Sequence, residues 1–442
     1  MAVCVSGPHT LLANRSNLKT VAVLSRENKM RVQYDLKQGQ SRNFHELPSG
    51  LSMEVIVQKG AEKKKKNVEY PPLVFVHGSY HAAWCWAEHW LPFFSSSGHD
   101  CYALSLLGQG ESDAPADSVV GTLQQTHARD VADFICRNIR SPPVLVGHSF
   151  GGLIIQYYVS NLGGDKLKGA FIHLLTENEE LYPKLKGAVL VCSVPPSGNS
   201  WIVWRYVFTK PIAAFKVTCS LAAKAFQTSL SLCKETFFSA TMEDHVVKRY
   251  QELMKESCRM PLFDLRKLNA SLPVPSVPNC PLEILVMGAK DDFIVDAEGL
   301  KETAKFYGVS PVCVEAVAHD MMLDVSWEKG AEVIHSWLNG LEKRRSKLQG
   351  PKTLINRVVS NNLVMILKHK TSWRCNSECV CVGFDAIACS LASISCKTHF
   401  VFNPKQQKIL SSSVKEPDSF LLMFSFPFVL CCCTCIKELS LL

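Results

Sequence analysis

The chain has 442 residues, of which 47% are hydrophobic and 20% are charged. This is the composition of a globular protein, and the chain is too long for a small disulfide-stapled scaffold despite its 19 cysteines. The net charge of +8 comes from the two ends, since residues 1–45 carry seven Lys/Arg against two Asp/Glu and residues 347–442 carry eleven against five. A nucleic-acid groove in the middle of the chain is therefore not expected.

The N-terminal segment has the composition of an address signal. Residues 1–26 contain no Asp or Glu and carry Arg15, Lys19 and Arg26 among several serines. An acid-free start with basic residues and serines is typical of an organelle transit peptide. We expect a chloroplast address; the alternative is a disordered N-terminus without an address, on a cytoplasmic protein. Residues 1–45 are assigned to this segment.

From residue 51, apolar runs of strand length alternate with longer amphipathic stretches. Continuous Val/Ile/Leu runs are typical of a parallel sheet that is covered on both faces. The expected strands are 53–57, 73–76, 102–106, 144–147, 188–191, 284–287 and 312–315. The expected helices are 122–139, 151–161, 297–307 and 327–341. This alternation predicts an α/β fold, a mostly parallel sheet with helices on both faces, over residues 46–346.

The second expected strand is followed by the loop F-V-H-G-S-Y-H-A-A-W-C-W at residues 75–86. His77 and His81 have the spacing of two metal ligands on one helix, but a glycine directly after a strand indicates a loop, so no metal ion is expected there. If a nucleophile lies nearby, the backbone N–H of Ser79 is a candidate to stabilise an oxyanion.

The sequence L-V-G-H-S-F-G-G-L at residues 145–153 places Ser149 between glycines, after an apolar strand and before an apolar helix. In this context G-x-S-x-G is typical of a sharp strand-to-helix turn that presents a serine nucleophile. The backbone N–H of Phe150 is then the second candidate oxyanion donor. An ordinary strand-to-helix turn is the alternative interpretation.

Residues 197–272 interrupt the alternation with a stretch rich in Ala, Leu, Phe, Lys and Ser and without a clear strand pattern. Helices are expected over 222–232 and 244–256. Because the stretch lies between two expected strands, it predicts a helical cap inserted above the carboxyl edge of the sheet. The aromatic residues of this cap suggest that the bound molecule has an apolar part.

A serine hydroxyl needs a base to take its proton, and in this architecture an acid and then a histidine follow the serine. Asp291 and Asp292 come just after the strand over 284–287, and His319 follows the last strand. The run D-F-I-V favours Asp292 as the acid, whereas a count from Gly288 favours Asp291. Spacing alone leaves both open.

The helical periodicity ends before residues 347–442, which we assign to a Cys-rich tail without a packed core. The 17 residues 420–436 form an apolar run at the short edge of a membrane span, which needs about 20 residues. Pro427 lies within the run. Membrane contact is therefore expected, if at all, only through this segment.

Together, the His-Gly loop, G-H-S-F-G-G, D-D-F-I-V and A-H-D-M-M-L-D resemble the α/β-hydrolase superfamily over residues 51–341. The run H-G-S-Y-H-A-A-W-C-W is similar to the plant methylesterase and hydroxynitrile lyase branch, and the remainder to plastid-type α/β hydrolases. One departure is S-L-L-G-Q-G at residues 105–110, where many members carry Asp-x-x-Gly-His-Gly in a structural turn.

The resemblance implies cleavage of a carboxylic ester, thioester or lipid ester through an acyl-enzyme, without a metal ion or an organic cofactor. Ser149 would attack, His319 would carry the proton and Asp292 would orient the imidazole. The implied partner is a small, apolar ester; the oligomeric state stays open. The alternatives are a hydroxynitrile-lyase-like enzyme and a small-molecule receptor with slow turnover. Gly78 favours hydrolysis, because those lyases carry a side chain at that position.

Overall fold

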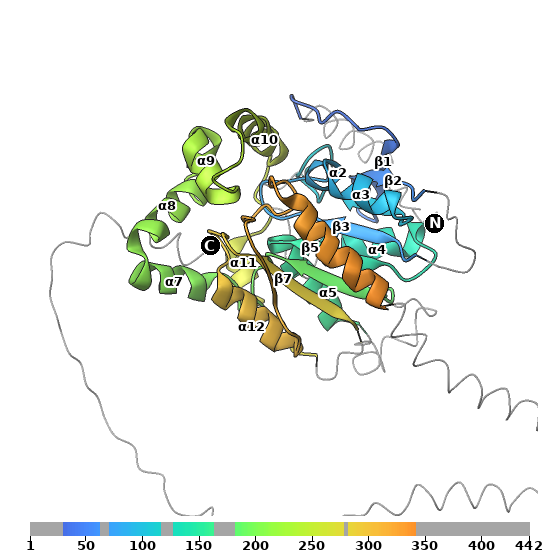
Figure 1. The fold of residues 1–442 in the computed structure, drawn as a ribbon. Coiled ribbons are helices and arrows are strands. Elements are labelled where there is room, and N and C mark those ends of the chain that lie inside the picture. The colour runs from blue at the N-terminus through green and yellow to red at the C-terminus, as the bar shows by residue number, and fades with distance from the viewer. Residues whose placement is uncertain (1–29, 62–69, 116–126, 163–181, 278–281, 342–442) are drawn as a thin grey trace, which may run out of the picture. The chain divides into compact units, whose positions relative to one another are not determined.

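The structure is a computed structural model that describes residues 30–61, 70–115, 127–162, 182–277 and 282–341. Its centre is an eight-stranded sheet in the order β1-β2-β4-β3-β5-β6-β7-β8 (Figure 1). The strands are β1 (Gln40–Glu46), β2 (Ser52–Gln58), β3 (Leu73–Val76), β4 (Cys101–Leu104), β5 (Val144–His148), β6 (Gly187–Val191), β7 (Ile284–Ala289) and β8 (Val312–Val314). Pairing is antiparallel from β1 to β2 and from β2 to β4, and parallel from β4 onward. The predicted mostly parallel α/β sheet is confirmed.

The central strands are buried on both faces because successive side chains enter two different hydrophobic clusters. Phe75 packs into one cluster and its neighbours Val74 and Val76 into the other, as the two-residue period of a strand requires. The first cluster includes α2 (Trp84–Ala87), α3 (Trp90–Ser96) and the helix over 327–341. The second includes α4 (Ala128–Asn138), α5 (Phe150–Ser160) and α12 (Ala297–Tyr307). Helices therefore cover both faces, as predicted.

The assignment of residues 1–45 to a transit peptide or disordered N-terminus is wrong for residues 30–45. Met30 and Tyr34 are buried in the core, and β1 pairs along its whole length with β2. The sequence pattern missed β1 because its side chains are mostly exposed, so no apolar run marks it. Backbone hydrogen bonds to β2 hold this edge strand instead. Residues 1–26, with the predicted address, lie outside the described residues.

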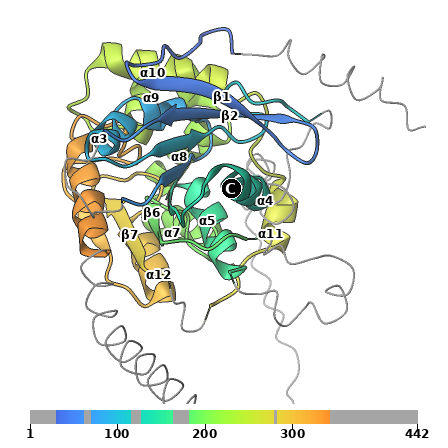
Figure 2. The ribbon, with the colours of Figure 1, turned by 90° about the vertical axis from the view of Figure 1, so that its right-hand side faces the viewer.

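The predicted cap is a set of helices between β6 and β7: α7 (Ser200–Thr209), α8 (Pro211–Leu221), α9 (Leu230–Phe237), α10 (Asp244–Ser257) and α11 (Leu265–Ala270). Figures 1 and 2 show α7 to α10 grouped beside the sheet rather than on its two helical layers. The helix predicted over 222–232 is wrong, because α8 ends at Leu221 and Lys224 adopts a left-handed conformation with φ 53°. A short 3₁₀ turn, Ala225–Gln227, leads into α9, whose N-terminus is capped by the Ser229 hydroxyl.

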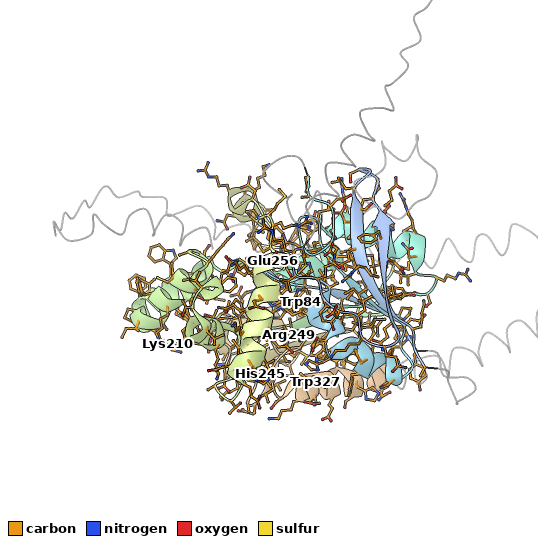
Figure 3. All side chains as sticks on the ribbon, turned by 90° about the horizontal axis from the view of Figure 1, so that it is seen from above. Trp84, Lys210, His245, Arg249, Glu256 and Trp327 are labelled. Carbon is orange, nitrogen blue, oxygen red and sulfur yellow. The ribbon has the colours of Figure 1, made fainter. Side chains whose placement is uncertain are left out.

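The α10 helix anchors the cap to the N-terminal part of the sheet domain. Trp84 and Tyr250 stack with ring centroids 5.9 Å apart, and the Trp84 indole N–H donates to the Ser257 hydroxyl at 2.7 Å. Arg249 donates two hydrogen bonds to the Glu88 carboxylate. Figure 3 shows Trp84 and Arg249 along this contact. The cap is therefore fixed at one end by α10.

Among the helices of the described ranges, none combines the length and the apolarity that crossing a bilayer requires. The tail over 347–442, with its apolar run at 420–436, lies outside the described residues, and the expectations for it stay predictions.

Candidate active site

Ser149 occupies a strained turn between β5 and α5. Its backbone has φ 52° and ψ −120°, a conformation that side-chain-bearing residues rarely adopt. The turn is tight because two glycines lie against the backbone. A Cβ on Gly151 would meet the Val76 carbonyl oxygen at 2.3 Å, and one on Gly147 would meet the Gly151 carbonyl oxygen at 2.7 Å. The predicted sharp turn is therefore present.

The Ser149 side chain faces a pocket. Only 7% of the residue is exposed, and its hydroxyl makes no hydrogen bond within the described part of the chain. Its backbone N–H donates to the Val191 carbonyl at 3.0 Å, so β6 holds the turn in place. Ser149 and His319 line the same pocket. Hydrogen bonds between such groups are often long in an unliganded site.

Of the two candidate acids, Asp292 forms hydrogen bonds with His319, and Asp291 points to solvent. The His319 Nδ1–H donates to both Asp292 carboxylate oxygens, each at 2.9 Å. Backbone N–H groups of Ile294 and Val295 donate to Asp292 Oδ1 at 2.8 Å and orient the carboxylate. Asp291 is exposed to solvent. Of the two aspartates that the spacing left open, the structure brings only Asp292 to the histidine.

The electrostatics around His319 favour its protonated form. Burial acts to lower the pKa of the imidazole, but the adjacent Asp292 carboxylate, its hydrogen bond and the charge of Asp320 hold that pKa above the ordinary histidine value. With Nδ1 committed to Asp292, the Nε2 atom remains to exchange a proton in the pocket. This is the arrangement of a general base.

His77 orients the peptide unit that carries the Ser79 N–H. The Leu106 N–H donates to His77 Nε2 at 3.0 Å, so Nδ1 bears the ring proton and donates to the Gly78 carbonyl at 2.7 Å. Burial lowers the pKa of His77 to about 3, which keeps the ring neutral. Since the Gly78 carbonyl and the Ser79 N–H point opposite ways across one planar peptide, fixing the carbonyl fixes the N–H.

Gly78 is required by the close approach of this loop to the serine turn. A Cβ at this position would lie 2.9 Å from Ser149 Cβ and 3.1 Å from the His148 carbonyl oxygen. The N–H groups of Ser79 and Phe150 donate to no other group in the described ranges, and both residues line the pocket. They are therefore available as the two predicted oxyanion donors.

A buried network joins the loops around the site, and the sequence interpretation missed it. His81 Nδ1 donates to the Ser79 carbonyl at 2.8 Å and Nε2 donates to Asp320 Oδ2 at 2.9 Å. His148, next to the serine, donates from Nε2 to the His319 carbonyl at 3.0 Å. His81, His148 and His319 together hold the pKa of Asp320 below its usual range, although burial alone would raise it.

The pocket above Ser149 contains about 800 Å³ of empty space when its open mouth is counted. The sheet domain supplies the polar floor, with the residues already described. The cap supplies an apolar roof, mainly from α7 and α8: Ile202, Val203, Tyr206, Ala214, Val217 and Leu221. An apolar roof over a polar floor suits a molecule with one reactive polar group and an apolar part.

Two buried sets of side chains have donor atoms close enough to hold a metal ion among the described residues. They are His148, His319 and Asp320, and Cys192, Asp292 and His319. In the second set, His319 Nδ1 and Asp292 already bond to each other. In the first, the His148 Nε2–H donates to a carbonyl. A metal ion would have to displace these bonds.

A mostly parallel sheet, a strained serine turn at the end of its central strand and an acid–histidine pair on later loops define an α/β hydrolase. Residues 73–333 match the family model described as the alpha/beta hydrolase family, so the chain belongs to that family. The Lip1 protein of Acinetobacter baumannii AYE has a similar solved structure, with a TM-score of 0.50 at 17% identity over 76% of this chain and 100% of that chain. This likeness supports the fold alone.

Partial sequence matches extend to plant proteins. The rice protein named "Probable esterase PIR7A" is 40% identical over 81 residues, which are 18% of this chain and 30% of that protein. Methylesterase 2 of Arabidopsis thaliana is 27% identical over 142 residues, 31% of this chain and 50% of that protein. Norfluorocurarine synthase 1 of Strychnos nux-vomica is 37% identical over 94 residues, 20% of this chain and 31% of that protein. The matches thus span 30% to 50% of the length of these relatives.

Proposed function

We propose that this protein hydrolyses carboxylic esters through an acyl-enzyme on Ser149. One observation carries the proposal: Ser149, the His319–Asp292 pair and the unpaired N–H groups of Ser79 and Phe150 converge on one apolar pocket. The names of the partly matching esterase and methylesterase point to the same reaction class. Gly78 supports hydrolysis over the lyase alternative.

In the proposed first step, Ser149 Oγ attacks the ester carbonyl carbon while His319 Nε2 takes the hydroxyl proton. The negative charge that develops on the carbonyl oxygen is stabilised by the N–H groups of Ser79 and Phe150. The bond from the carbonyl carbon to the alcohol oxygen then breaks, and the alcohol leaves with the proton from His319. The Asp292 carboxylate stabilises the transient imidazolium.

In the proposed second step, water attacks the acyl carbon of the Ser149 ester and gives a proton to His319 Nε2. The bond to Ser149 Oγ breaks, the serine recovers its proton from His319, and the acid leaves. No further reactant is needed. The apolar residues of α7 and α8 would contact the acyl or alcohol chain, so esters with an apolar chain are the expected substrates.

Labelling of the full-length chain with a fluorescent fluorophosphonate tests the proposal. The wild type and the matched control Ser49→Ala, at an exposed serine, should label and hydrolyse p-nitrophenyl esters, and Ser149→Ala should do neither. Equal labelling of the wild type and Ser149→Ala would contradict a nucleophilic Ser149. Cyanide release from a cyanohydrin without ester turnover would point to a lyase, and tight small-molecule binding without turnover to a receptor.

A further inference from the structure

The α7–α8 hairpin presents apolar side chains on two opposite faces. Its inner face lines the pocket. On its outer face, Trp204, Phe208, Ile212 and Phe215 have exposed fractions of 41%, 78%, 75% and 69%. Only three other large apolar side chains in the described ranges are exposed to this extent, and they are scattered. The outer face is therefore a concentrated apolar patch, and such patches mark interaction sites.

On each of the two helices the exposed apolar side chains follow helical spacing, so each pair lies on one face of its helix. Trp204 and Phe208 are one turn apart on α7, and their rings stack with centroids 6.1 Å apart. Ile212 and Phe215 are three positions apart on α8. We call these four residues, with Lys210 between them, the outer surface. Figure 1 shows the α7–α8 hairpin that carries these residues at the left edge of the described fold.

The segment that carries the outer surface contains basic residues and no acidic residues. Residues 197–234 contain Arg205, Lys210, Lys216, Lys224 and Lys234 and no Asp or Glu. Arg205, Lys216 and Lys234 pair with acidic residues of other segments. Lys210 forms no ion pair within the described ranges and lies at the outer end of the hairpin (Figure 3). Lys210 is therefore a cation without a carboxylate partner in these ranges; its Nζ lies 5.5 Å from the centroid of the Tyr206 ring, and in sequence it stands between Phe208 and Phe215.

We propose that the outer surface docks on an anionic lipid bilayer. Aromatic and aliphatic side chains flanked by lysine are typical of helices that lie in the membrane interface. Juxtaposed lysines gain affinity for anionic headgroups. Aromatic side chains are enriched at protein interfaces as well, but lysine is depleted there, so Lys210 is the residue that favours the bilayer over a protein partner. The exposed side chains Trp204, Phe208, Ile212 and Phe215 enter the interface, and Lys210 contacts lipid phosphate or carboxylate.

Docking has a consequence for the pocket, and this part rests on the proposed function. The same two helices line the pocket with their inner face, so a docked hairpin brings the pocket next to the bilayer. Esters with long apolar chains partition into the bilayer, and the enzyme would then meet them at the interface. Such esters should be hydrolysed faster when they are supplied in vesicles than when they are dissolved in water.

Vesicle sedimentation with the full-length chain tests the docking. We expect binding to vesicles of mixed phosphatidylcholine and phosphatidylserine. The triple variant Phe208→Ser/Ile212→Ser/Phe215→Ser should bind at least about tenfold more weakly, from the lost apolar burial. Lys210→Glu should weaken binding about fivefold or more to the anionic vesicles and leave binding to pure phosphatidylcholine unchanged. The matched control is Phe44→Ser, at an exposed phenylalanine of β1, which should bind as the wild type does.

Three results would overturn the proposal. In the first case, the wild type sediments with neither kind of vesicle. In the second case, the triple variant binds as tightly as the wild type, which assigns binding to another segment such as 420–436. In the third, the triple variant changes the sedimentation coefficient of the protein without changing vesicle binding, which makes the surface a contact between copies. Ser149→Ala separates the two proposals, because it should lose ester turnover and keep vesicle binding.

Discussion

His81 Nε2 lies 2.9 Å from the carboxylate of Asp320, although the two residues are 239 positions apart in the chain. Both are almost fully buried, with exposed fractions of 1% and 0%. Because His81 also donates to the Ser79 carbonyl, one imidazole connects the loop of the candidate oxyanion donor to the residue directly after His319. The pair therefore sets the relative position of two loops that belong to different ends of the domain.

Breaking this pair should destabilise the fold. His81→Ala leaves the Asp320 carboxylate buried without its strongest partner, and we expect the free energy of unfolding to fall by about 3–5 kcal/mol. Asp320→Asn should also destabilise. The double variant should lose less stability than the sum of the losses in the two single variants, because the interaction between the two side chains can be lost only once.

Urea unfolding of the full-length single and double variants measures this coupling. His245→Ala is the matched control, since that side chain is 77% exposed and its removal should change stability by no more than about 0.5 kcal/mol. Strictly additive losses from His81→Ala and Asp320→Asn would show that the two groups do not depend on each other.

The two neighbouring aspartates allow a matched comparison of the candidate acid. Asp292→Asn removes the charge that orients and stabilises the His319 imidazolium, and kcat should fall by about 10⁴-fold. Asp291→Asn changes an exposed side chain next to it and should leave kcat near the wild-type value. Steady-state hydrolysis of a p-nitrophenyl ester measures both. A greater loss in Asp291→Asn than in Asp292→Asn would transfer the role of the acid to Asp291.

The sequence predicted those parts of the fold and candidate site that depend on local patterns. Continuous apolar runs marked the seven strands from β2 to β8, and the glycines beside Ser149 marked the turn. It did not predict β1, whose exposed side chains carry no apolar signal. It also assigned no role to Asp320 or His148, because their partners come from distant loops that only the folded chain brings together.

The protonation of His319 should set the acidic limb of the activity profile. Its pKa is raised above the ordinary histidine value of 6.5, since Asp292 and Asp320 together outweigh the effect of burial. The proposed base must be neutral at Nε2 to take the Ser149 proton. As the pH falls through this raised pKa the ring becomes charged, so kcat/KM should decline with a midpoint above 6.5.

Measurement of kcat/KM against pH tests whether the pKa of His319 is raised and whether the nearby carboxylates raise it. Asp320→Asn removes one of the charges that raise the pKa of His319, so the acidic limb should move to lower pH while activity at high pH is retained. A wild-type midpoint at or below 6.5, or a limb that Asp320→Asn leaves in place, would show that these carboxylates do not control His319.

Gly78 should be essential for activity because of the space beside Ser149. In Gly78→Ala the added Cβ would stand 2.9 Å from Ser149 Cβ, so the loop has to move and carry the Ser79 N–H with it. Loss of one oxyanion donor typically lowers kcat by about 10²–10³-fold, and we expect a loss of that size.

Gly50→Ala is the comparison, because Gly50 has φ +81° and no atom within 4 Å of an added Cβ. It should cost about 1 kcal/mol of stability through backbone strain alone and leave kcat unchanged. Ester kinetics and urea unfolding of both variants separate these effects, and wild-type kcat in Gly78→Ala would remove the Ser79 N–H from the proposed mechanism.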